Sequence, residues 1–108
     1  MIEVEYKGYI IRIGNTQDEN DMLVKTSNSD DFWAHANDHP SAHAIILNPT
    51  KQRIKSKIIK RACCLIKSNT NKLKSIQNVD FCYTRIKNIT PTEIPGQVTL
   101  GEHSILTI

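Results

Sequence analysis

Histidines are the first side chains in this sequence whose spacing could support chemistry. His35, His39 and His43 are separated by four residues each, whereas His103 lies far away. On a helix, this spacing would stack three imidazoles along one face, as in zinc sites. Pro40 and the turn-forming residues around it argue against a helix. We therefore expect His35 and His43 on two strands joined by a tight loop, where they could become cross-strand neighbours.

A metal-dependent enzyme is the least favoured function for this segment. Asp31, His35 and His43 could form a hydrolytic centre, yet nothing in the sequence marks a nucleophile or an oxyanion loop. The three cysteines lack C-x-x-C spacing, and the four glycines are scattered, so no phosphate-binding glycine loop is present. We expect no catalytic residue, no metal and no cofactor. Trp33 is expected to be a core or half-buried aromatic residue, an interpretation we favour over a base-stacking platform.

The elements that position these residues form a mixed pattern of strands and helices. Period-two alternation predicts a hairpin over residues 3–13, and residues 18–26 are expected to form a short helix capped by Thr16 or Asp18. Further strands are predicted at Phe32–Ala36, Ala42–Leu47 and Val79–Thr84, and a closing hairpin is predicted from 97–100 and 104–108, after a loop at 89–94. The pattern favours one α+β domain over residues 1–108, with a mostly antiparallel or mixed sheet.

The strongest helix signal covers residues 50–67. Its apolar side chains fall on one side at 100° per residue, and its basic side chains fall on the other. Lys51, Arg53 and Lys55 would lie in the first turns, where the helix dipole disfavours positive charge by roughly 0.3–1 kcal/mol each. This placement favours a functional role for the basic side over a purely solubilising one.

Charge is segregated along the chain, although the net charge is only +3. Residues 1–40 carry eight acidic and three basic side chains, whereas residues 51–87 carry eleven basic side chains and one acidic side chain. In one domain, such segregation indicates a basic face for a polyanion. The alternative is that the lysines only keep an amphipathic helix soluble.

Several motifs follow one another in an order that resembles a known family. They are Tyr9–Gly14, Glu19-Asn20-Asp21-Met22-Leu23, Asp31-Phe32-Trp33-Ala34-His35, Pro40-Ser41-Ala42-His43-Ala44, the aromatic strand Val79–Thr84 and Pro95-Gly96-Gln97-Val98. Together they resemble the NFACT-R domain, the RNA-binding domain of ribosome quality-control factors, which also begins a family of eukaryotic coiled-coil proteins. Ser41-Ala42 departs from the Gly-Ser of the family pattern. We expect the chain to consist of this domain alone, without a coiled coil or further domains.

The resemblance implies a non-catalytic module that binds RNA, with tRNA or rRNA as the expected ligand in a ribosome quality-control context; DNA is a possible substitute. The residues expected to contact phosphates are Arg53, Lys57, Lys60, Arg61, Lys67, Lys72, Lys74, Arg85 and Lys87. The family-motif residues, structural or ligand-contacting, are Asp31, Trp33, His35, His43, Pro95 and Gly96. Phosphate contacts carry little sequence information, so poor sequence specificity and a steep salt dependence are expected.

A different class of function stays open: a protein-interaction adaptor that docks on a ribosomal or other complex through the acidic N-terminal part. The longest uncharged stretch, from Pro40 up to Lys51, is too short to span a bilayer, and residues 2–5 show no signal-peptide pattern. We expect an intracellular, cytoplasmic protein without membrane association.

Overall fold

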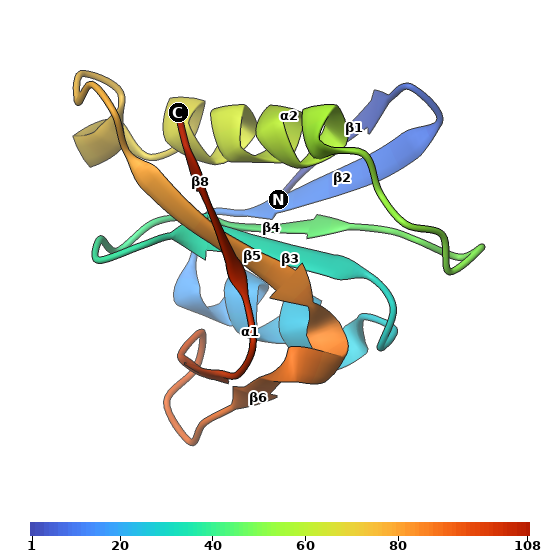
Figure 1. The fold of residues 1–108 in the computed structure, drawn as a ribbon. Coiled ribbons are helices and arrows are strands. Elements are labelled where there is room, and N and C mark those ends of the chain that lie inside the picture. The colour runs from blue at the N-terminus through green and yellow to red at the C-terminus, as the bar shows by residue number, and fades with distance from the viewer.

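A six-stranded sheet forms the middle layer of the computed structural model, which describes residues 1–108 (Figure 1). The strand order is β1-β2-β4-β3-β5-β8, and every pair is antiparallel. The strands are β1 (Ile2–Tyr6), β2 (Tyr9–Gly14), β3 (Phe32–Ala36), β4 (His43–Ile46), β5 (Asp80–Arg85) and β8 (Ser104–Thr107). The predicted α+β class with a mostly antiparallel sheet is confirmed.

Two helices cover opposite faces of this sheet (Figure 1). Helix α2 (Ser56–Ser68) lies on one face, and helix α1 (Gln17–Thr26) lies on the other together with a small sheet of β6 (Ile89–Pro91) and β7 (Val98–Leu100). The turns η1 (Asn71–Leu73) and η2 (Ile86–Asn88) follow α2 and β5. Neither α-helix has the length and apolar content that a bilayer crossing requires.

Strand alternation divides the core into two parts. Ala34, Ala44 and Phe81 belong to the larger part, which packs against Ile58 and other buried residues of α2. Trp33 and its same-face neighbours belong to the smaller part, which packs against α1. Because both faces are covered, the central strands bury both of their alternating sets of side chains.

The predicted short helix and first hairpin are confirmed. The Thr16 side chain caps α1 by accepting a hydrogen bond from the Glu19 backbone N–H at 3.1 Å. The β1–β2 turn consists of Lys7 and Gly8, both with positive φ (50° and 87°), as a two-residue hairpin turn of the primed type requires.

The predicted start of the long helix is wrong, because α2 begins at Ser56 instead of residue 50 or 51. Lys51 has a φ of 56° and Lys55 has extended backbone, so neither belongs to a helical turn. Lys51, Arg53 and Lys55 therefore do not oppose the helix dipole, and that argument for a functional role no longer applies. Local periodicity did not reveal this because Ile54, one of the apolar positions, is buried without being helical.

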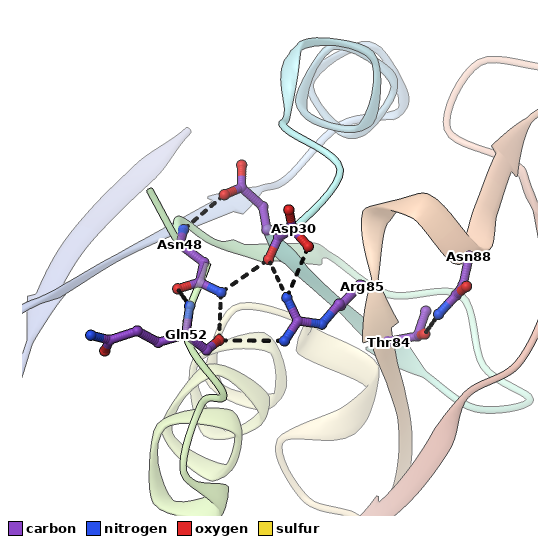
Figure 2. A network of polar contacts seen from close by, with 7 residues as sticks. Asp30, Asn48, Gln52, Thr84, Arg85 and Asn88 are labelled. Carbon is purple, nitrogen blue, oxygen red and sulfur yellow. Dashed lines mark hydrogen bonds and ion pairs between the residues drawn. The ribbon is translucent and has the colours of Figure 1, made fainter. Parts of the chain in front are cut away.

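A side-chain clasp by Asn48 holds the segment before α2 in its non-helical path (Figure 2). The Asn48 amide donates to the carbonyl oxygens of Gln52 at 2.7 Å and Asp30 at 3.2 Å, and its oxygen accepts from the Gln52 N–H at 3.1 Å. Asn48 is only 2% exposed. Its side chain therefore satisfies backbone groups that a helix would have paired internally.

The predicted closing hairpin is also wrong, since β7 and β8 do not pair with each other. β7 pairs with β6, which lies inside the segment predicted to be a loop, whereas β8 pairs with β5 at the edge of the large sheet. Between them, the Gly101 N–H donates to the Asn88 carbonyl at 2.8 Å and the Thr84 hydroxyl donates to the Glu102 carbonyl at 2.7 Å. Alternation marks a strand but does not specify its partner.

Removing the Asn48 clasp tests its contribution to stability. Asn48→Ala deletes three buried or half-buried hydrogen bonds, so we expect the free energy of unfolding to fall by about 2–3 kcal/mol. Gln52→Ala is the matched control, because Gln52 is exposed and contributes only its backbone; its effect should stay within about 0.5 kcal/mol. Urea denaturation measures both, and equal losses in the two variants would contradict the clasp.

Candidate nucleic-acid interface

The outward side of α2 carries unpaired positive charge. Lys57, Lys60 and Arg61 are exposed there, while Ile58 and Ile59 on the opposite side are buried. The structure contains four ion pairs, Met1–Glu19, Arg12–Glu3, Lys25–Asp21 and Arg85–Asp30, and none of them involves α2. We call Lys57, Lys60, Arg61 and Lys67 the α2 basic face.

Three predicted residues lie at or beyond the C-terminal end of α2. Lys67 and Lys74 line one depression together with Ile108, whose carbonyl accepts a hydrogen bond from Lys67 Nζ at 3.3 Å. Lys72 is exposed in η1. The structure thus continues the positive charge of the helix beyond its last turn.

The remaining three predicted residues lie toward the other end of α2. Arg53 lines a depression with Phe32 and Tyr83, and Arg85 and Lys87 line a neighbouring one that shares these two aromatic residues. The predicted set is therefore divided between the two ends of the helix.

Arg85 differs from the others because its guanidinium is already bound within the protein (Figure 2). It pairs with Asp30 Oδ1 at 3.1 Å, donates to the Asp30 and Gln52 carbonyls at 3.4 Å each, and lies 4.8 Å from the Phe32 ring centroid. The Arg85 guanidinium is therefore largely neutralised by Asp30, and its hydrogen bonds connect β5 to the segments before β3 and α2.

A separate cleft of about 690 Å³ gathers most of the family-motif residues. It lies where the β3–β4 turn, the first turn of α1 and the β6–β7 turn meet, on the sheet face opposite α2. Trp33, His35, His43, Pro95 and Gly96 all line it. Asp31 does not, so the three residues of the metal-enzyme hypothesis are not brought together.

Asp31 is instead a buried anchor for two backbone segments. Its carboxylate accepts hydrogen bonds from the Asn48 N–H at 2.7 Å and the Asn28 N–H at 2.9 Å. No group of three or more His, Cys, Asp or Glu residues lies close enough together to hold a metal ion. The role of Asp31 in the motif is thus to join the start of β3 to the end of β4.

Three residues on the floor of the cleft are linked by hydrogen bonds. Trp33 Nε1–H donates to His43 Nδ1 at 3.1 Å, and the His43 backbone N–H donates to Asn20 Oδ1 at 3.2 Å. Because Nδ1 accepts, the neutral His43 ring carries its proton on Nε2. Gly14 leaves room for the Asn20 side chain in this arrangement, since a Cβ at position 14 would collide with Asn20 Oδ1.

The two histidines are cross-strand neighbours, as expected, with ring centroids 4.7 Å apart and planes at 82°. The Trp33 and His35 rings lie parallel, with centroids 5.8 Å apart and planes within 3°. Burial, followed by the charge of the neighbouring His35, lowers the pKa of His43 to about 3, and burial also lowers the pKa of His35. Both rings are therefore neutral near pH 7.

Two residues that shape the cleft have clear structural reasons. Gly96 has a φ of 81°, and a Cβ there would lie 3.1 Å from the Gln17 carbonyl oxygen, so glycine lets the β6–β7 turn pack on α1. Asn20 links α1 to β4, a role that the sequence analysis missed. Its place in the Glu19–Leu23 motif was the available signal.

Comparison with known proteins agrees with this architecture. Residues 2–105 match the NFACT protein RNA binding domain. A coiled-coil domain-containing protein 25 homolog from Dictyostelium discoideum is 32% identical over 87 residues, which cover 78% of this chain and 42% of that protein. The solved C-terminal part of the fibronectin/fibrinogen-binding protein from Streptococcus suis has the same fold, with a TM-score of 0.85 and 24% identity over 98% of this chain and 43% of that one. The chain thus spans less than half the length of either relative.

The neutral His43 predicts a specific loss of stability in acid. Its pKa is about 3 in the folded chain against an ordinary 6.5, so below pH 6.5 the unfolded chain binds more protons. Stability should therefore fall as the pH falls, by about 1.4 kcal/mol per pH unit from this group. His43→Gln can still accept from Trp33 but does not titrate, so its unfolding free energy should depend less steeply on pH between 6.5 and about 4.

Urea denaturation at a series of pH values measures that slope, whatever the absolute stability of the variant. The exposed His39→Gln controls for the loss of a surface histidine. An unchanged slope in His43→Gln would show that this ring is not held neutral in the folded chain.

Proposed function

This chain belongs to the NFACT RNA-binding domain family, and from that premise we propose that it is a non-catalytic module that binds RNA through the α2 basic face. The observation that carries the proposal is the absence of any carboxylate partner for Lys57, Lys60 and Arg61 on the exposed side of one rigid helix. Because no carboxylate neutralises these cations, they are available to bind a phosphate backbone. The release of counterions from the RNA then supplies the affinity.

The separation of opposite charges between the two helices supports the same orientation. Helix α2 contains no acidic residue, whereas α1, on the other face of the sheet, carries Asp18, Glu19 and Asp21. A polyanion is therefore attracted more strongly to the α2 side than to the α1 side. A surface that only served solubility would not require this division between the two faces.

Within the predicted set, we assign different roles to the two ends of the helix. Lys72 and Lys74 extend the α2 basic face, while Arg53 and Lys87 lie at its periphery and Arg85 is omitted because Asp30 neutralises it. Contacts of this type read backbone position and shape, so the ligand is expected to be structured RNA such as tRNA or rRNA, with DNA as a weaker substitute. We place the module in a ribosome quality-control context, where a protein partner can contribute to its recruitment.

Neutralising two lysines tests the interface. Lys57→Gln with Lys60→Gln should weaken binding to a hairpin RNA about tenfold at low salt and reduce the slope of log affinity against log salt by about 1.5, because two phosphate contacts are lost. Fluorescence anisotropy over a salt series measures both quantities. Arg61 is left unchanged since its guanidinium also lies over the Tyr6 ring, 5.6 Å from the centroid.

The matched control is Arg12→Gln with Lys25→Gln, which removes the same charge from β2 and α1. Both side chains are partly exposed and paired with carboxylates, so their loss should leave the salt slope unchanged. An equal loss of affinity in the two double variants would mean that binding follows net charge alone, and the α2 basic face would not be the interface.

A further inference from the structure

The cleft on the α1 side has a lining unlike that of the α2 basic face. No lysine or arginine lines it, and its one carboxylate is Asp38 on the exposed β3–β4 turn. Imidazole and amide groups from His35, His43, Asn20 and Gln17 line it together with apolar side chains and two prolines. Such a lining suits an uncharged, flat ligand with polar atoms at its edge, and it does not suit a phosphate group.

Two hydrogen-bond donors in this cleft have no partner within the protein. His43 is only 3% exposed, and its Nδ1 is occupied by Trp33, yet Nε2–H makes no hydrogen bond. The amide nitrogen of Asn20, which is 7% exposed, is likewise unpaired, because only its oxygen is used. Every fully enclosed side-chain nitrogen or oxygen in the protein has a partner, so these two donors are not fully enclosed, and the residues that carry them line the cleft.

A stacking surface lies beside these donors. The His35 ring is half-buried and parallel to the ring of Trp33, which is buried in the core. Burial lowers the pKa of His35, so the ring is an uncharged aromatic plane near pH 7. A third flat ring placed on His35 would extend the row of parallel rings and come within reach of the donor on His43.

We infer that this cleft binds one unpaired nucleobase of an RNA strand, stacked on His35 and hydrogen-bonded by His43 Nε2–H and the Asn20 amide. The inference rests on the proposed function and adds to it a site for a single-stranded segment of the ligand. Acceptor atoms on the base edge complement the two donors, and the uncharged base suits a lining that lacks cations.

A hydrogen bond joins the segment after α2 to a residue that neighbours the cleft. The Ala42 N–H, one residue before His43, donates to the Thr70 hydroxyl at 3.1 Å, which ties the segment after α2 to the start of β4. That segment continues directly into η1 with Lys72 and on to Lys74, at the same end of the sheet as the β3–β4 turn (Figure 1). We expect an RNA strand that leaves the helix over these lysines to reach the cleft.

Trp33 is the only tryptophan of the chain, so its fluorescence reports on the cleft alone. We expect a short oligoadenylate to change Trp33 emission on binding, and an oligonucleotide of the same length without bases to bind through its phosphates without doing so. A duplex RNA should behave like the strand without bases. His35→Ala should weaken oligoadenylate binding about tenfold, as loss of one stacked base predicts, and leave duplex binding unchanged.

Two further variants separate an effect of His35→Ala on binding from an effect on folding. His35→Phe keeps an aromatic plane and should retain oligoadenylate affinity, whereas His103→Ala removes an exposed histidine outside the cleft and should change nothing. Unfolding midpoints of all variants confirm that each is folded.

The outcomes separate this inference from the proposed function. Equal binding of the strands with and without bases, with no effect of His35→Ala, would overturn the nucleobase site while the Lys57 and Lys60 variant still tests the α2 basic face. Adenosine monophosphate that binds as tightly as oligoadenylate would also overturn it, because the cleft would then be a site for a free nucleotide. If none of the RNAs binds the unmodified protein, both proposals fail.

Discussion

The covered sheet is the constraint on which the rest of this structure depends. With α2 on one face and α1 on the other, β4 is buried along its whole length, and only Phe32 and His35 of β3 remain partly exposed. Ala34 and Ala44 are small and let α2 lie close to the sheet. Trp33 and His43 are large side chains with polar ring nitrogens on the other side of the sheet, where the buried Trp33 N–H donates to His43 Nδ1.

This division also places the two candidate RNA contacts in separate layers. The α2 basic face is made by an amphipathic helix whose buried isoleucines, each contributing about 1.5–3 kcal/mol on burial, hold its lysines outward. The cleft is made below the sheet by residues from three turns that meet only in the folded chain. In the proposed complex, charge and aromatic chemistry would act at different places on one ligand, and a hydrogen bond from Ala42 to Thr70 joins the segment after α2 to the start of β4.

The two histidines form a pair of neutral aromatic rings and do not form the hydrolytic centre considered from the sequence. Their rings meet as the spacing around Pro40 predicted, but Asp31, which would have been needed for hydrolytic chemistry, binds backbone N–H groups instead. Without a carboxylate partner, and with burial lowering both pKa values, the imidazoles are neutral near pH 7. Neutral rings stack and donate hydrogen bonds, which is the chemistry that base recognition uses.

Local pattern determined much of this protein from the sequence alone: the α+β class, the first hairpin, α1, the central strands, the α2 basic stripe and the pairing of His35 with His43. These features depend on periodicity and turn chemistry, which act over a few neighbouring residues. The tertiary structure decided where α2 begins, because the Asn48 side chain, which is anchored to Asp30, and the distant Arg85 guanidinium occupy backbone groups of Gln52 that a helix would use. It also decided the partners of β7 and β8, the neutralisation of Arg85 by Asp30, and the meeting of Asn20 with His43. Each of these joins residues far apart in the chain, and a local pattern contains no information about which distant group will satisfy an exposed strand edge or a polar side chain.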